Sequence, residues 1–147
     1  MNNTLLNASK TTRVMNAIAA GTTNQNSSVI DMQGFEGITF TAIFGTLTAT
    51  AVTGIKVQQG NQSDGSDAQD LAGSAVSIPD TGSNKVLITE IYKPTKRYVR
   101  CIVTRGTANA VIDGVIAQQF GARIDPPVQD SSVAASDHWV SPAEGVA

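Results

Sequence analysis

Charged side chains are scarce in this chain of 147 residues, because Asp, Glu, Lys and Arg make up only 15% of it. Soluble domains usually contain about 25%, so Thr, Ser, Asn and Gln must cover much of the surface. Ten basic and twelve acidic residues give a net charge of −2. A nucleic-acid-binding domain normally carries a clear positive excess. This balance argues against a nucleic-acid partner and favours contact with other proteins.

Cysteine and histidine are nearly absent, with one residue of each, Cys101 and His138. A lone cysteine forms no internal disulfide, and we expect Cys101 to be a small buried hydrophobe between Val99 and Val103. A single histidine near the C-terminus argues against a catalytic triad, and neither a nucleophile elbow nor a phosphate-binding glycine motif occurs. We therefore predict a protein that is not an enzyme and has no cofactor.

Two groups of acidic residues are candidates for a catalytic carboxylate pair and for a metal site. Asp31 and Glu36 flank a turn and have the residue types of a glycosidase pair, but acids that simply form turns are far commoner. A polar loop over residues 60–73 contains three more acids, Asp64, Asp67 and Asp70. These offer oxygen ligands for Ca²⁺. Their spacing differs from that of an EF-hand loop, so a solvated loop is favoured and no metal is predicted.

Long apolar runs are also missing. The first ten residues lack the basic region and apolar stretch of a secretory signal. No run approaches the roughly 18 apolar residues that a membrane span requires. We expect synthesis in the cytoplasm and no membrane partner.

The main pattern in the sequence is an alternation of apolar and polar residues, which is typical of β-strands. The clearest run covers residues 37–44, where Ile38, Phe40, Ala42 and Phe44 share one face of a strand. Other stretches rich in Thr, Val and Ile cover residues 11–20, 29–32, 48–59, 75–78, 85–93, 96–105 and 109–120. About eight strands separated by turns predict an all-β fold, with a jelly-roll-like β-sandwich as the first choice. An immunoglobulin-like sandwich and an up-and-down barrel are the alternatives.

Three local features refine this pattern. Residues 11–20 fit both helical and strand spacing, and we favour a strand. Pro94 and Thr95 supply turn residues, so residues 85–93 and 96–105 are predicted to pair as a hairpin. Gly114 interrupts the last strand and predicts a bulge.

Both ends of the chain lack the alternating pattern. Residues 1–10 are predicted to be an N-terminal arm, residues 11–121 the sandwich domain and residues 122–147 an extended C-terminal tail. The only tryptophan, Trp139, lies in the tail. It is predicted to anchor the tail on a neighbouring surface, with folding back over an open sheet end as the alternative.

Basic residues concentrate in residues 85–105, where Glu90 is the only acid. They are Lys85, Lys93, Lys96, Arg97, Arg100 and Arg105. A basic face on this hairpin would suit an acidic protein surface, because arginine binds carboxylates in a bidentate manner. A solvated face or a protected edge strand accounts for the same pattern. The candidate interface residues are Lys96, Arg97, Arg100, Arg105 and Trp139.

Three parts of the sequence resemble small structural proteins encoded near the capsid genes of tailed bacteriophages. They are residues 29–37 (VIDMQGFEG), residues 56–60 (KVQQG) with 63–68 (SDGSDA), and residues 93–100 (KPTKRYVR). The likeness spans about residues 13–123. It implies a virion structural protein, namely a capsid decoration or cement protein with a jelly-roll-like fold. Such a protein would bind the outer capsid surface as a dimer or trimer and bridge subunits of the major capsid protein.

Two other functions stay open. The protein can belong instead to the phage tail or to the base of a head fibre, which copy number per particle distinguishes. It can also be a carbohydrate-binding module, which stacks sugar rings on exposed aromatic side chains. Aromatic residues make up only 5% of the chain, and beyond four Phe they are Tyr92, Tyr98 and Trp139. This scarcity weakens the carbohydrate hypothesis.

Overall fold

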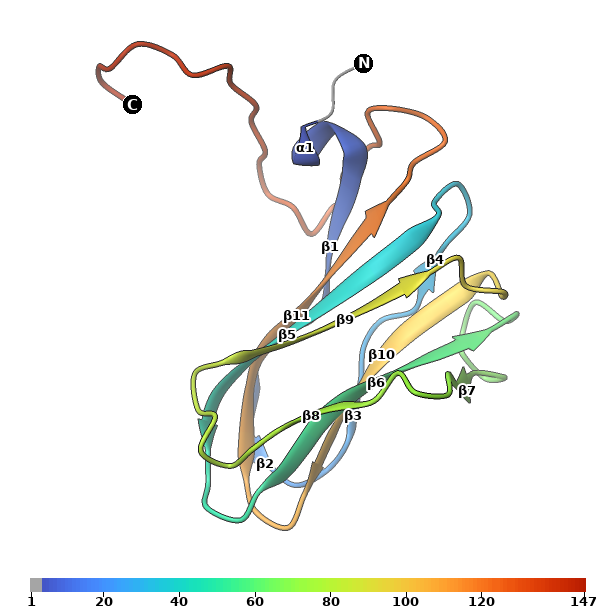
Figure 1. Cartoon of the computed structure of the whole chain (residues 1–147), viewed down its shortest axis with the longest axis vertical. Coiled ribbons are helices and arrows are strands. Elements are labelled where there is room, and N and C mark those ends of the chain that lie inside the picture. The colour runs from blue at the N-terminus through green and yellow to red at the C-terminus, as the bar shows by residue number, and fades with distance from the viewer. Residues whose placement is uncertain (1–3) are drawn as a thin grey trace.

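The computed structural model describes residues 4–147 as two antiparallel sheets packed face to face (Figure 1). In spatial order the first sheet contains β1 (Ser9–Met15), β11 (Ala110–Phe120), β5 (Gly37–Leu47) and β9 (Val86–Tyr92), and β2 (Ile18–Gly21) also pairs with β11. The second sheet contains β3 (Gln25–Asn26), β10 (Tyr98–Gly106), β6 (Val52–Gly60) and β7 (Gln69–Asp70), with β4 (Ile30–Asp31) beside β10 and β8 (Val76–Ile78) beside β6. The prediction of an all-β, jelly-roll-like sandwich is confirmed. Residues 4–147 form eleven strands rather than about eight because several are only two to four residues long.

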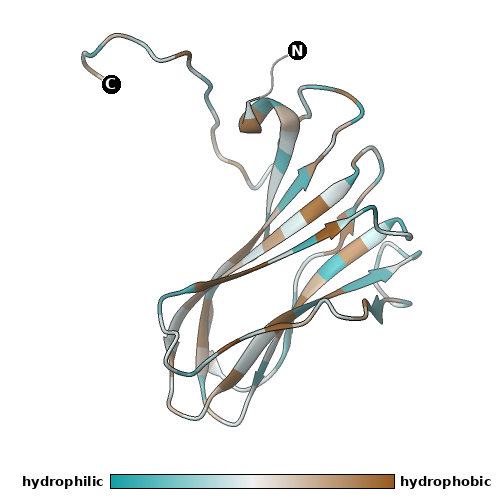
Figure 2. Ribbon diagram, viewed as in Figure 1, coloured by the Kyte–Doolittle hydropathy of each residue, from teal (hydrophilic) through white to brown (hydrophobic). Residues whose placement is uncertain are grey.

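The core lies between the sheets, where alternation turns one side of each long strand inward. In β5 the fully buried side chains are Ile38, Phe40, Ala42 and Phe44. Thr39 and Thr41 between them are only half-buried. Hydrophobic residues are prominent on the strands and sparser in the turns (Figure 2). Each large apolar side chain that is fully buried contributes about 1.5–3 kcal/mol, so this packing holds the two sheets together.

Cys101 belongs to this core, as predicted. It lies between Val99 and Val103 on β10, and all three side chains are at most 1% exposed. Burial raises the pKa of the Cys101 thiol to about 12. The thiol therefore stays uncharged and is not a reactive nucleophile.

Two local predictions are also confirmed. Residues 11–20 form strand rather than helix, since β1 and β2 cover most of them. Gly114 has a φ of 155°, and the pairing of β11 with β5 shifts between Ile112 and Gly114. The bulge lies where glycine is the residue that adopts this backbone conformation most readily.

The predicted hairpin of residues 85–93 and 96–105 is wrong. β9 pairs with β5 in the first sheet, whereas β10 pairs with β6 in the second. The connection between them crosses from one sheet to the other. Alternation specifies which face of a strand is buried but not which strand lies beside it. β9 and β10 therefore lie in different sheets, and the inward side chains of both contribute to the core between the sheets.

The N-terminal boundary differs from the predicted one. β1 begins at Ser9, so the division between an arm over residues 1–10 and a sandwich over residues 11–121 falls inside a strand. Residues 1–3 of that arm lie outside the described residues. Before β1 comes α1 (Leu5–Ala8), a single helical turn. Nothing in the described part of the chain is a helix long and apolar enough to cross a membrane.

The tail covers the free edge of β1. The Thr11 amide donates to the Gln129 side-chain oxygen at 2.8 Å, and the Arg13 amide donates to the Ser132 hydroxyl oxygen at 2.8 Å. The Gln129 amide nitrogen in turn donates to the Ser9 carbonyl oxygen at 2.7 Å. An uncovered edge strand is a template for pairing with other chains. We call residues 129–132 the latch because their side chains satisfy backbone groups of this edge.

The latch predicts a difference between two adjacent serines. Ser132→Ala removes the acceptor of the Arg13 amide, so it should lower the free energy of unfolding by about 1 kcal/mol and speed hydrogen exchange at that amide. Ser131→Ala is the matched control, since the Arg13 amide donates to Ser132 and not to the adjacent, equally exposed Ser131. Urea unfolding and amide exchange of both variants measure the difference. Equal exchange rates at Arg13 in the two variants would show that the latch does not protect the edge.

Candidate protein-interaction site

Three connecting segments meet at one end of the sandwich. The Lys93 amide after β9 donates to the Glu36 carbonyl oxygen at 2.7 Å, and the Arg123 amide after β11 donates to the Gly34 carbonyl oxygen at 2.9 Å. Gly34 has a φ of 88°, a backbone conformation that residues other than glycine rarely adopt. The turn before β5 is thereby fixed against the other two segments.

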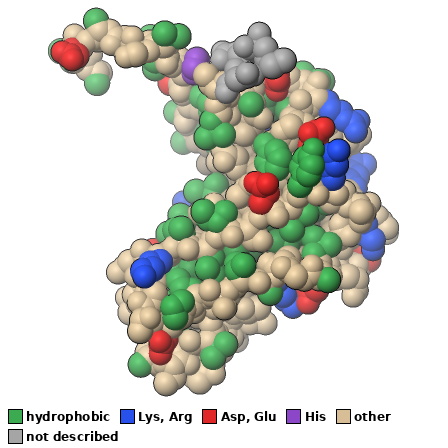
Figure 3. Space-filling view, in the orientation of Figure 1, with side chains coloured by type: hydrophobic (Ala, Val, Ile, Leu, Met, Phe, Trp, Pro, Cys, Tyr) green, Lys and Arg blue, Asp and Glu red, His purple; other side chains and the backbone are tan. Residues whose placement is uncertain are grey.

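An open cavity of about 530 Å³ lies at this end, and it is lined by side chains of all three segments. We call its four basic residues the basic end, namely Lys93, Lys96, Arg97 and Arg123. Phe35, which also packs against the core, and the acidic residue Glu36 line the same cavity. Figure 3 shows that much of the lysine and arginine surface in this view gathers at one end of the body, whereas other side chains cover most of the rest. The site therefore combines positive charge with an aromatic centre.

Arg97 is held in place by Asp31. Its Nε and Nη2 atoms donate to the two carboxylate oxygens of Asp31 at 2.9 and 2.8 Å, and Nη2 also donates to the Gln33 side-chain oxygen at 2.6 Å. These bonds from Arg97 hold the pKa of the Asp31 carboxyl below its usual value. The guanidinium also lies over the Tyr98 ring, 5.2 Å from its centroid. Arg97 is thus oriented rigidly, but Asp31 neutralises much of its charge.

Lys93 and Lys96 have no such carboxylate partner in the described residues. The Lys93 ammonium lies 5.2 Å from the centroid of the Tyr92 ring. The Lys96 amide donates to the Gln59 side-chain oxygen at 3.4 Å, which ties this connection to β6. These two lysines and Arg123 therefore carry most of the free positive charge of the basic end.

The structure separates Arg100 and Arg105 from the basic end. Arg100 is on the outer face of β10, where its Nε atom donates to the side-chain oxygen of Gln58 on β6 at 2.8 Å. Arg105 is only 7% exposed, so it is not part of an exposed basic face. It is at an odd-numbered position of β10, like Val99 and Val103, and alternation alone places it inward.

Arg105 instead joins β2, the segment that follows it and the start of β11. Its Nε atom donates to the Thr23 carbonyl oxygen at 2.8 Å, and Nη1 donates to the carbonyl oxygens of Ala19 and Ala110 at 2.9 and 2.8 Å. Its guanidinium lies against Gly21, where a side chain would crowd it. Burial lowers the pKa of Arg105. The role of this residue is structural.

Arg105→Ala should therefore destabilise the fold far more than Arg100→Ala. The first variant leaves three buried or part-buried carbonyl oxygens without their charged donor, at a cost of about 3 kcal/mol. The second removes one part-buried hydrogen bond between side chains and should cost about 1 kcal/mol. Chemical unfolding of both variants measures the two losses. Similar losses would contradict the structural role.

The Asp31 and Arg97 pair gives a pH-dependent prediction. A double-mutant cycle with Asp31→Asn and Arg97→Gln should give a coupling of about 0.5 kcal/mol at pH 7, because both side chains are partly exposed. Since the pKa of Asp31 is lowered in the folded state, this stabilisation is complete above the ordinary value of 3.8 and is lost as pH falls through the folded value. Urea unfolding over this range measures it. A coupling that persists unchanged in acid would contradict the assignment.

A second, more apolar hollow adjoins the basic end. It has a volume of about 500 Å³ and shares Phe35 and Arg123 with the first cavity. Its other lining includes Lys10, Ile124, Pro126, Pro127 and Val128. Sequence reasoning missed Lys10, Phe35 and Arg123. The sequence did contain a sign of Phe35, because an aromatic residue in a turn between Gly34 and Gly37 has few sequence neighbours that can cover its ring.

Trp139 does not lie at the basic end. Its side chain is 70% exposed, and the indole nitrogen donates to the Asp137 carboxylate at 2.7 Å. It does not fold back over the sheet end, and its contact with a neighbouring molecule stays a prediction. Tyr92 stacks on Phe120, with ring centroids 6.4 Å apart, and Tyr98 lies on the other sheet. The three aromatic residues considered for sugar stacking thus come from three separate parts of the molecule.

The acidic residues considered as ligands each have their own local partners. Asp67 accepts hydrogen bonds from the amides of Asn61 and Gln62, and Asp64 accepts one from the Ser66 amide. Asp70 forms an ion pair with Lys56 at 2.7 Å. Within residues 4–147, no three His, Cys, Asp or Glu side chains are grouped as metal ligands.

Comparison with known proteins identifies the fold. No protein-family model matches the sequence, and no curated protein matches it. A chain in the structure of infectious bursal disease virus Gx strain is similar, with a TM-score of 0.50 and 11% sequence identity over 80% of this chain and 34% of that chain. The Gt strain structure gives a TM-score of 0.47 at 9% identity over 76% and 32%. The crystal structure of the VP2 subviral particle of this virus gives 0.37 at 10% identity over 76% and 33%.

The match to the Gx strain structure shows a shared β-sandwich fold. This chain spans about a third of the length of the virus-particle chains that it matches. The similarity therefore concerns the sandwich as an architecture and assigns no residue a role.

Proposed function

We propose that this protein is a virion structural protein that decorates and stabilises the capsid of a tailed bacteriophage. On the outer surface of the particle, it would bridge neighbouring subunits of the major capsid protein. The proposal is supported by a fold that also occurs in infectious bursal disease virus particles and by the sequence resemblance to phage structural proteins. The observation that carries it is the basic end, where Lys93, Lys96 and Arg123 line one cavity with Phe35 and form no ion pair within residues 4–147.

The basic end has the properties of a protein-binding surface. Its segments are held by backbone hydrogen bonds, so little conformational entropy is lost when a partner binds. An aromatic centre with a charged rim is typical of protein interfaces. Acidic side chains on a capsid subunit would complement this surface and set its orientation.

Stabilisation of a shell by such a protein does not require one strong contact. Each copy would bind two or more capsid subunits, so that separation of those subunits breaks several interfaces at once. The low content of charged residues, 15%, limits the cost of removing water from these contacts. Many copies of a moderate interface can thereby strengthen the whole shell.

Quantitative mass spectrometry of purified particles tests this function. The particle of the phage that encodes the chain should contain it at a copy number comparable to that of the major capsid protein. The triple variant Lys93→Gln, Lys96→Gln, Arg123→Gln should reduce occupancy roughly tenfold, since rim charges steer and orient binding. Lys56→Gln is the control, because Lys56 lies on the second sheet and pairs with Asp70.

Each other outcome has a definite meaning. A handful of copies per particle would assign the protein to the tail or to a head-fibre base. Absence from particles would refute a virion role. Unchanged occupancy of the triple variant, with a normal unfolding curve, would show that another surface binds the capsid.

A further inference from the structure

The outer face of the first sheet has an apolar patch that the described residues leave largely exposed. The inward alternation of β5, β9 and β11 leaves their intervening side chains pointing outward, and several of these are aliphatic. We call four neighbouring ones the apolar face: Ile43, Val86, Ile88 and Ile116. Val86, Ile88 and Ile116 are 48%, 58% and 38% exposed. The first half of β9, an edge strand, is apolar on both faces (Figure 2), which indicates a surface that another chain covers.

The four side chains are neighbours by strand register. Ile43 lies directly opposite Val86, and Thr41 lies between Ile88 on one side and Ile116 on the other. A hollow of about 330 Å³ is lined by Ile43 and Ile116 together with Arg13 and Val133. The patch is therefore continuous across three strands and includes a recess.

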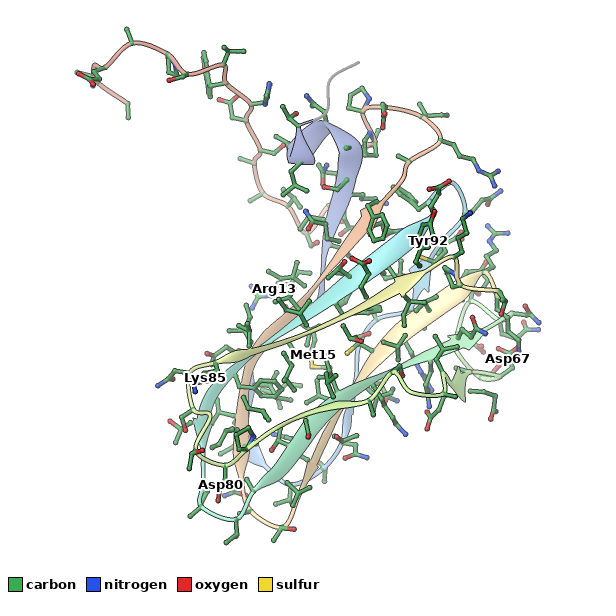
Figure 4. All side chains as sticks on the ribbon, viewed as in Figure 1. Arg13, Met15, Asp67, Asp80, Lys85 and Tyr92 are labelled. Atoms are coloured by element: carbon green, nitrogen blue, oxygen red, sulfur yellow. The ribbon has the colours of Figure 1, made fainter. Side chains whose placement is uncertain are left out.

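Charged side chains of both signs lie near the apolar face. Arg13 on β1 and Lys85 directly before β9 are both exposed (Figure 4), and among the described residues neither forms an ion pair. Asp113 lines the hollow with Arg13, and Glu90 is exposed two residues after Ile88. A segment that binds here should be apolar at its centre, with acidic residues that pair with Arg13 and Lys85.

The end of this same chain has that composition. Trp139 and Val140 are 70% and 86% exposed, and they lie between Asp137 and Glu144 in the sequence. Residues 124–147 contain four acids and no lysine or arginine, whereas residues 1–123 contain ten basic and eight acidic residues. The tail and the apolar face are thus complementary in hydrophobicity, and the acids of the tail can pair with Arg13 and Lys85.

A chain does not place this segment on its own apolar face. The latch holds residues 129–132 at the β1 edge, and Ser136 to His138 then lie beside Leu6 and Asn7 of α1. From there the tail extends away from the body, at the opposite end from the start of β9 (Figure 1). The apolar face of a second copy can lie beside this tail, because its position is not fixed by the latch.

We propose that residues 134–147 of one copy bind across the apolar face of a second copy. Extended, this segment spans up to about 45 Å, and a sheet of four strands is only about 14 Å across. Two copies can exchange their segments reciprocally, which gives a symmetric dimer with two equivalent contacts. This inference does not depend on the proposed function, because it concerns the protein by itself.

Sedimentation of the full-length protein tests the exchange. The unaltered chain should be a dimer at micromolar concentration, and Trp139→Ala and Ile88→Thr should each weaken dimerisation roughly tenfold or more. Val52→Thr is the matched control, because Val52 is a strand residue of the second sheet that is 65% exposed. It should leave dimerisation unchanged. Unfolding curves of all variants confirm that they fold.

Fluorescence distinguishes the remaining arrangements, since Trp139 is the only tryptophan. Its emission should shift to shorter wavelength with the same concentration dependence as dimerisation. A shifted emission in a monomer would mean that the tail folds back on its own chain, and this would overturn the proposal. A dimer that Trp139→Ala leaves intact would overturn it in favour of direct contact between sheets. A monomer with fully exposed tryptophan would also overturn it, while leaving the capsid-occupancy test unaffected.

Discussion

The burial of alternate side chains between two sheets is the constraint on which the rest of this structure depends. Ile38, Phe40, Ala42 and Phe44 are fully enclosed, and each of their neighbours along β5 must then point away from the core. Only one face of each sheet can be buried in a two-layer sandwich. Everything that the protein presents to partners is therefore outside these layers: the outer faces, the edges and the connecting segments.

The open edges of the sandwich explain several features that have no counterpart in the core. β1 is an edge strand, and two side chains from the latch occupy its outward backbone groups. Arg105 serves a related purpose at β2, where its guanidinium binds carbonyl oxygens that no strand pairs. Polar side chains thus complete the hydrogen bonding of a fold whose sheets do not close.

Sequence patterns predicted which face of each strand is buried more successfully than which strands pair with each other. Alternation in residues 37–44 identified the buried face of β5, and the same rule applied to Arg105 would have placed it inside. The hairpin prediction failed because Pro94 and Thr95 indicate a turn without indicating which sheet the next strand joins. The basic end was only partly foreseen, since Lys96 and Arg97 lie there whereas Arg100 and Arg105 do not. Arg123 is far away in the sequence, and only the pairing of β11 brings it beside Lys93.

The latch also affects what the end of the tail can do. A flexible segment loses conformational entropy when it binds, and the loss grows with the number of residues that become ordered. Because Gln129 and Ser132 already fix the chain at the β1 edge, only the residues beyond Val133 remain to be ordered by a partner. The fixed starting point also keeps the exposed Trp139 within a limited distance of the body, which raises its effective concentration near any neighbour docked there. An edge covered by side chains rather than by a paired strand therefore does two things: it protects β1, and it positions an apolar segment for contact between molecules.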